Sequence, residues 1–211
     1  FLPIILEQNY SSFEVILVDD QSKDNTEYIL KGLKEKYKNL KIVKIEMHVK
    51  HRVGKKFALT LGIKAAKHEY LLLTDVDCIP SSKNWLSRIV NNFSDEKQIV
   101  LGYGAYKKKK GLLNKMIRFD GFNVAVQYFS FALASFSYMG VGRNLAYKKS
   151  IFFDNKGFAS HIHIPSGDDD LFIQEVATKK NVIIEISEDS HTISETKESW
   201  REWILQKRRH V

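Results

Sequence analysis

The chain has 211 residues, of which 44% are hydrophobic and 27% are charged, and this balance excludes an intrinsically disordered or fibrous protein. The lone cysteine, Cys78, excludes a disulfide framework and a metal cage built from several cysteines. Lysine and arginine number 33 against 25 acidic residues, and the formal charge of +8 favours anionic partners such as nucleotide phosphates, acidic lipids or nucleic acid.

The first half of the sequence alternates strand and helix patterns. Apolar runs that end in acidic residues are typical of strands buried on both faces, and turn or N-cap residues precede the helical patterns. In chain order we expect a helix end at 1–6, strands at 14–18, 41–45 and 70–74, and helices at 28–37 and 55–66. This repetition predicts βαβ units, and therefore an α/β fold with a mostly parallel central sheet flanked by helices.

The second half is less regular. We expect helices at 85–93, after 170 and from 200 onward, strands at 99–103, 144–147 and 182–186, and an aromatic-rich segment at 119–138. The aromatic residues favour core packing, with an acceptor groove or a membrane interface as the alternatives. The basic run at 107–110 predicts a solvated loop or a contact with acidic lipid. The longest apolar stretch, 124–139, is too short and too polar to span a bilayer.

Carboxylates follow two of the predicted buried strands. Asp19 and Asp20 end one of them, and Asp75 and Asp77 follow another. In an open parallel sheet, ligands bind beyond the carboxyl ends of the strands. Asp75 and Asp77 are two residues apart, so in an extended backbone both side chains leave on the same side, as a pair of ligands for Mg²⁺ or Mn²⁺ would. A helix cap at Asp75 and a solvated Asp77 are the alternative.

Two further charged sites stand at predicted helix starts. Lys55 follows Gly54, where backbone N–H groups and the helix dipole favour phosphate, although a solvated surface lysine explains it equally well. Three aspartates, 168–170, follow Gly167. Their mutual repulsion favours proton uptake and the helix start favours the charged form. An N-cap followed by two solvated acids is the alternative.

In this order and at these separations the motifs resemble those of the family 2 glycosyltransferases with the GT-A fold, over nearly the whole chain. The resemblance rests on the nucleotide-binding strand and turn at 14–26, the Gly-Lys helix start at 54–59, the Asp-x-Asp at 73–77, the acidic acceptor motif at 166–171 and a Gln-x-x-Arg motif at 206–209. It implies one catalytic domain over 1–211, a GT-A type Rossmann-like fold whose nucleotide-binding half ends at about 105 and whose acceptor-binding half begins at about 106.

The chain departs from the family pattern in two places. The family normally has a strand before the position of residue 1, and its end also contacts the nucleotide, so we expect either weak nucleotide binding or an empty sheet position. His210 stands where the Gln-x-x-Arg motif of membrane-associated, often processive members is usually followed by tryptophan. That departure weakens the case for processive synthesis. Both ends of the sequence resemble those of a piece of a longer chain.

The resemblance implies an inverting transfer of a sugar from a nucleoside diphosphate sugar, most simply a UDP-sugar, to a hydroxyl group. The acceptor would be a carbohydrate or a lipid-linked sugar in polysaccharide or glycolipid synthesis. The full protein would work at the cytoplasmic side of a membrane, which it would contact through segments flanking this chain. The cofactor would be Mn²⁺ or Mg²⁺.

The implied roles fall on ten residues. On the donor side, Asp19 and Asp20 would contact the uracil or ribose, Asp75 the ribose or sugar, and Lys55, Gln206 and Arg209 the diphosphate region. Asp77 would ligate the metal together with Asp75, and His191 is a candidate for a further ligand. Asp169 would be the general base, with Asp168 beside it. In the last helix, Trp200, Trp203 and Ile204 are predicted to form a buried stripe.

Two other functions fit parts of the sequence. A sugar nucleotidyltransferase also uses aspartates at strand ends, but it should carry an early glycine-rich basic loop, which this sequence lacks. A basic nucleic-acid-binding module fits the charge, but recognised motifs for RNA or DNA are absent from the sequence. We therefore expect no nucleic-acid partner.

Overall fold

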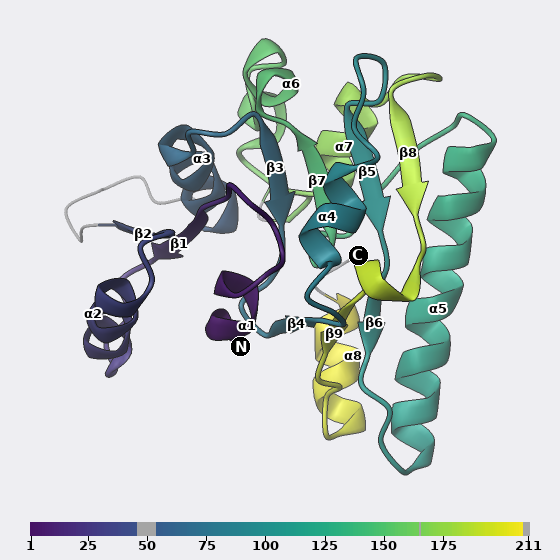
Figure 1. Cartoon of the computed structure of the whole chain (residues 1–211). Helices are drawn as coiled ribbons and strands as arrows, with labels where there is room; N and C mark the ends of the chain where they lie inside the picture. Colours follow the sequence, from purple (N-terminus) through teal and green to yellow (C-terminus); the bar gives the residue numbers. More distant parts are fainter. Residues whose placement is uncertain (46–53, 165, 209–211) are drawn as a thin grey trace.

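A computed structural model describes residues 1–45, 54–164 and 166–208 (Figure 1). Its central sheet has four strands in the order β3 (Tyr70–Leu73), β7 (Leu145–Lys148), β5 (Ile99–Gly102) and β8 (Val182–Glu185). β3, β5 and β8 share one direction, because β7 is antiparallel to both β3 and β5 and β8 is parallel to β5. The α/β fold is confirmed, but the central sheet is mixed: β7 runs against its two neighbours, and only β5 and β8 form a parallel pair. The strand at β7 was predicted, and its antiparallel direction was not.

Two smaller sheets accompany the central one. β1 (Val15–Asp19) pairs in parallel with β2 (Leu40–Lys44). Below the central sheet in Figure 1, β9 (Thr192–Ser194) lies between β4 (Cys78–Pro80), to which it is antiparallel, and β6 (Gly104–Tyr106), to which it is parallel. Within the described residues β1 forms no pairing with β3. The additional family strand stays a prediction.

The predicted helices are present, and their bounds differ from the sequence patterns by a few residues. They are α1 (Leu2–Leu6), α2 (Thr26–Lys36), α3 (Lys55–Ala65), α4 (Trp85–Val90), α7 (Asp170–Val176) and α8 (Trp200–Arg208). The aromatic-rich segment lies mostly within α5 (Leu112–Leu133), whereas α6 (Lys149–Asp154) and two single 3-10 turns (Ala159–His161 and Glu188–Ser190) were not predicted. None of the helices in the described ranges has the length and apolar character needed to cross a membrane.

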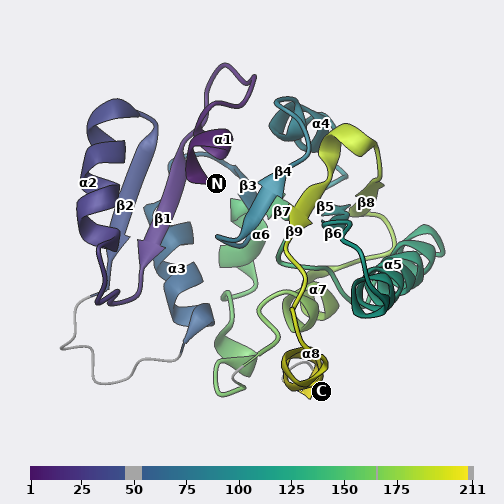
Figure 2. The same cartoon turned by 90° about the horizontal axis from the view of Figure 1, so that it is seen from below.

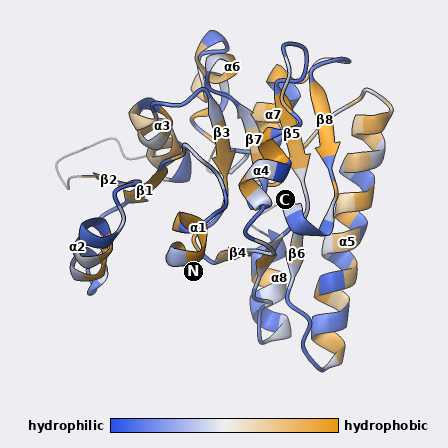
Figure 3. Ribbon diagram, viewed as in Figure 1, coloured by the Kyte–Doolittle hydropathy of each residue, from blue (hydrophilic) through white to orange (hydrophobic). Residues whose placement is uncertain are grey.

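The central sheet is covered on both faces, which explains its continuous apolar strands. Successive residues of a strand point to opposite faces. Ile99 and Leu101 of β5 therefore join a large cluster with residues of α3, α5, α6 and α7. Val100, between them, packs with Trp85 and Ile89 of α4 on the other face. Figure 3 shows the resulting hydrophobic strands at the centre of the molecule.

The prediction of core packing for the aromatic segment is right for one part of it and wrong for another. Tyr128 is buried and donates its hydroxyl hydrogen to the carbonyl oxygen of Gly102, 2.8 Å away. Phe122, Phe131 and Phe136, by contrast, are exposed to solvent. A helix of 22 residues on the outside of the sheet can bury only one of its faces, so Phe122 and Phe131 on its other side point outward, and Phe136 follows the end of the helix.

Candidate functional site

Lys55 brings together two acidic motifs that lie far apart in the sequence. It is the first residue of α3, and α3 begins there because Gly54 adopts a positive φ of 66°, which favours glycine. The Lys55 Nζ lies 3.2 Å from Asp75 Oδ1, in the turn after β3, and 2.9 Å from Asp168 Oδ2, before α7. The predicted donor-side lysine therefore joins the Asp-x-Asp motif to the acidic acceptor motif.

The carboxylates of Asp75 and Asp168 keep the Lys55 side chain positively charged. Burial alone would lower the pKa of Lys55, but Asp75 and Asp168 outweigh that effect and hold its pKa above the ordinary value for lysine. A raised lysine pKa means that the stabilising effect is complete below the unfolded value, roughly 10.4, and disappears only as the pH rises through the higher folded value. Because about half of the Lys55 side chain is exposed, these ion pairs serve to position the motifs more than to stabilise the fold.

Asp169 is fixed in the same cluster by two backbone donors. Its Oδ2 accepts a hydrogen bond from the Gly142 N–H at 2.8 Å, and its Oδ1 accepts one from the Asp170 N–H at 2.9 Å. A Cβ atom on Gly142 would lie 3.4 Å from both Asp169 Oδ2 and Lys55 Nζ, so the loop before β7 packs directly against these two side chains. Asp169 is thus the N-cap of α7, and it also belongs to the acidic cluster. The alternative of an N-cap followed by two solvated acids is only partly right, because a single acid, Asp170, follows the cap and it is half-buried.

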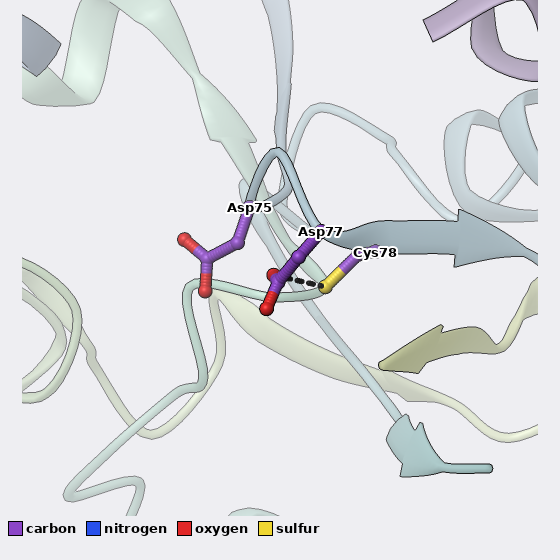
Figure 4. A group of neighbouring side chains, drawn as sticks. All are labelled: Asp75, Asp77 and Cys78. Atoms are coloured by element: carbon purple, nitrogen blue, oxygen red, sulfur yellow. Dashed lines mark hydrogen bonds between the residues drawn. The ribbon is translucent and has the colours of Figure 1, made fainter. Parts of the chain in front are cut away.

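The Asp-x-Asp motif offers two oxygen ligands on one side of the turn between β3 and β4. Potential ligand atoms of Asp75, Asp77 and Cys78 lie within 4.8 Å of one another (Figure 4). Figure 4 shows both carboxylates pointing to the same side. Carboxylate oxygens suit Mg²⁺ or Mn²⁺, which take their remaining ligands from water and phosphates. The residues present therefore fit the predicted metal.

Cys78 adds little to such a site. Its side chain is buried, burial raises its pKa, and its Sγ lies 3.1 Å from the Ser194 Oγ on β9. A thiol that keeps its proton is a poor ligand, since metals bind the thiolate, and Mg²⁺ and Mn²⁺ prefer oxygen. The two carboxylates are the ligands that the geometry supports.

The structure does not bring His191 to the carboxylates. The antiparallel register of β4 and β9 pairs Cys78 with Ser194 and Pro80 with Thr192, so His191 lies beyond the far end of β4 from Asp77. Its Nε2 lies 3.1 Å from the carbonyl oxygen of Ile186, and its ring packs edge-on against Tyr103. Within the described residues the candidate metal group does not include it.

Asp19 is the last residue of β1, and Asp20 follows it. Asp19 is buried and accepts a hydrogen bond from the Ser22 N–H at 3.0 Å, which orders the turn after the strand. Asp20 is exposed and lies 3.5 Å from the Gln21 amide nitrogen. In the described part of the chain, neither carboxylate contacts the Lys55 cluster. Nucleotide binding by this pair stays a prediction.

The end of α8 is described only in part. Gln206 lies on α8, and Arg209 lies outside the described residues. The predicted buried stripe is wrong, because Trp200 and Ile204 are each exposed by nearly half. Helical spacing correctly predicts that these residues share a face, but in the described chain no element buries that face.

Arg143 is a functional candidate that no sequence motif indicated. It follows Gly142, and its guanidinium group lies over the ring of Tyr106, 4.2 Å from the centroid. Its Nη1 donates to the Ser194 Oγ at 3.3 Å, and that hydroxyl also contacts Cys78. A cation therefore stands beside the Asp-x-Asp turn, on the side of β6 and β9. In the sequence, the position of Arg143 directly after Gly142 is the only feature that could have indicated its role.

Lys56 was also missed, since a lysine in an amphipathic helix is normally solvated. Only 1% of it is exposed. Its Nζ donates to the carbonyl oxygens of His161 at 2.7 Å and Ile164 at 3.1 Å, and burial lowers its pKa. Lys56 thus ties the start of α3 to the segment that leads into the acidic acceptor motif.

Replacement of Lys56 by methionine should destabilise the fold by about 2 kcal/mol. Two carbonyl groups would lose their donor, and each unsatisfied buried group costs roughly 1–3 kcal/mol, partly offset by removal of a buried charge. Urea unfolding measures the change. The matched control is Lys64→Met on the exposed side of α3, with an expected change within about 0.5 kcal/mol. Equal stability of the two variants would contradict this role of Lys56.

Comparisons with known proteins agree with this fold. S. aureus TarS 1–349, solved in complex with UDP-GlcNAc, has the same fold: the TM-score is 0.63 at 20% identity, over 94% of this chain and 54% of that one. Its complex with UDP aligns with a TM-score of 0.62. Glycosyltransferase GlyG of Streptococcus pneumoniae is 29% identical over 109 residues, 51% of this chain and 35% of GlyG.

Poly-beta-1,6-N-acetyl-D-glucosamine synthase of Staphylococcus epidermidis is 35% identical over 78 residues, 37% of this chain and 18% of that enzyme. The matches thus span about a third or less of these curated relatives. A sequence model described as glycosyl transferase family 2 matches residues 4–156, which is most of the chain. The chain therefore belongs to glycosyl transferase family 2, and it has a GT-A type fold.

Proposed function

We propose that this chain transfers a sugar, with inversion, from a UDP-sugar to a hydroxyl group of a carbohydrate or lipid-linked acceptor. The observation that carries the proposal is the contact of Lys55 with both Asp75 and Asp168. It sets the candidate donor-side motif against the candidate acceptor motif. The family favours sugar transfer over the nucleotidyl transfer considered as an alternative.

Asp169 is the group best placed to act as general base. Its two backbone hydrogen bonds fix its direction, yet a carboxylate has about four acceptor sites, so it can still accept a hydrogen bond from an acceptor hydroxyl. In the reaction the hydroxyl proton passes to Asp169 as the oxygen forms a bond to the anomeric carbon. The bond from that carbon to the diphosphate breaks on the opposite face, and the diphosphate oxygen keeps the electron pair.

Positive charge on the donor side favours departure of the diphosphate from the anomeric carbon. Lys55 is cationic across the physiological pH range, and Arg143 stands on the other side of the Asp-x-Asp turn. Asp75 and Asp77 would hold Mn²⁺ or Mg²⁺, which when bound neutralises charge that develops on the leaving diphosphate. Asp20, Gln206 and Arg209 are proposed as further contacts of the nucleotide and the diphosphate, on the strength of the family motifs.

The choice of a UDP-sugar and of a polysaccharide or glycolipid product is supported by the proteins that resemble this chain. TarS was solved with UDP-GlcNAc and with UDP, and the S. epidermidis relative is named as a polysaccharide synthase. We place the reaction at the cytoplasmic side of a membrane, because the +8 charge suits the anionic lipids of that leaflet.

Melting temperatures with a panel of nucleotides test the donor proposal. UDP at about 100 times its Kd, with Mn²⁺, should stabilise the fold by roughly 2.7 kcal/mol and raise the Tm by several degrees. ADP and GDP at the same concentration are the controls and should give smaller shifts, as should UDP with a chelator. Equal shifts for all three nucleotides, or none, would contradict the assignment of a UDP-sugar.

A further inference from the structure

α5 exposes a continuous apolar stripe. Leu112, Phe119, Val126 and Leu133 are seven residues apart, and their exposed fractions are 68%, 66%, 43% and 72%. Seven residues make almost two full turns, so these side chains lie along one face of the helix with a small drift. The exposed side chains of Met116 and Phe122 flank them. We call these six residues the α5 stripe.

The stripe is not needed to hold α5 in place. The opposite face of the helix packs against β6 and β8 and buries Ile117, Ala125 and Tyr128. Figure 2 shows α5 at the edge of the molecule, beyond β6 and β8. From Leu112 to Leu133 the stripe extends about 30 Å at 1.5 Å per residue. A contiguous exposed apolar patch of this size marks an interaction site.

The charges around the stripe indicate the chemistry of its partner. Residues 107–138 carry six basic side chains and one acidic side chain: Lys107, Lys108, Lys109, Lys110, Lys115, Arg118 and Asp120. Asp120 is paired with Lys207 of α8, and Lys107 and Lys109 are paired with Glu195. Lys108, Lys110 and Lys115 are exposed and have no ion-pair partner within the ranges that the structure describes.

We propose that the α5 stripe docks on an anionic lipid bilayer. Its apolar side chains enter the boundary between headgroups and acyl chains, while Lys108, Lys110 and Lys115 contact the anionic headgroups. A lipid surface is both apolar and anionic, whereas a second copy of this chain would bring another +8 charge to the same place. This inference concerns binding and is independent of the proposed sugar transfer.

Co-sedimentation with vesicles tests the proposal. The chain should bind vesicles of phosphatidylcholine containing 30% phosphatidylglycerol more tightly than vesicles of phosphatidylcholine alone. Phe119→Ser with Phe122→Ser should weaken binding to the anionic vesicles by at least about tenfold, since it removes two aromatic groups that would enter the bilayer. Lys108→Gln with Lys110→Gln should weaken it by a similar factor and reduce the preference for anionic vesicles.

A matched control uses another exposed apolar pair, Tyr28 and Ile29 of α2. Tyr28→Ser with Ile29→Ser should leave vesicle binding unchanged, and far-UV circular dichroism confirms folding of each variant. If the double variant does not fold, the single variant Phe119→Ser is tested in its place. Loss of binding in the control to the same degree, or full binding by the stripe variant, would overturn the proposal. So would a dimer that forms through the stripe without any binding to vesicles.

Discussion

Replacement of Asp77 by asparagine should reduce sugar transfer by about a thousandfold and leave the fold intact. The carboxamide keeps the size of the side chain and one oxygen ligand but lacks the negative charge that a divalent cation requires. Loss of Lewis-acid stabilisation of the leaving diphosphate amounts to several kcal/mol of the barrier. Asp77 is exposed, so the free energy of unfolding should change by less than about 0.5 kcal/mol. Turnover at increasing Mn²⁺ concentration measures the effect.

The control for Asp77 is Asp95→Asn, which changes another exposed aspartate outside the site. It should retain full turnover and the full Mn²⁺-dependent rise in Tm with UDP, whereas Asp77→Asn should lose both. If Asp77→Asn reached the parent rate at saturating Mn²⁺, the carboxylate would not be a required ligand, and Asp75 alone would have to hold the metal.

The longer strands and helices around the site were predictable because each obeys a local rule, whereas the three-residue strands β4, β6 and β9 were not predicted. β3 and β5 pack apolar side chains on both faces, and this produces the continuous apolar runs that identified them. The direction of β7 was not predictable, because an apolar run of four residues has the same composition whichever way it runs. α6 has six residues, too few for a helical repeat to be recognised before Ile151 and Phe152 are seen to be buried.

The candidate site also has a part that was predictable from the sequence and a part that was not. That the donor and acceptor motifs belong to one site was predictable from their order along the chain, and the contacts of Lys55 with Asp75 and Asp168 bring these two motifs together. The burial of Lys56 was not, because it depends on a carbonyl group 105 residues further along the sequence. The position of His191 depends on the register of β4 with β9, which no local pattern determines.

Asp169→Asn should lower kcat by a factor between about 10² and 10⁴, the usual contribution of a general base. The amide cannot accept the acceptor proton. UDP binding should be unchanged, because the base acts on the acceptor and not on the nucleotide. A modest loss of stability, about 1–2 kcal/mol, should accompany the change, since an amide nitrogen replaces one of the two oxygens that accept from Gly142 and Asp170. Single-turnover rates and the Tm with UDP separate these effects.

The neighbouring aspartate supplies the decisive control for this assignment. Asp170 also accepts a backbone hydrogen bond at the start of α7, from the Leu171 N–H at 2.9 Å, but it makes no contact with the Gly142 loop in the described structure. Asp170→Asn should therefore share the loss of stability while keeping kcat within a few-fold of the parent. If both variants lost activity equally, the cluster would act through its total charge or through the fold of the helix start. Asp169 would then be a positioning residue and not the base.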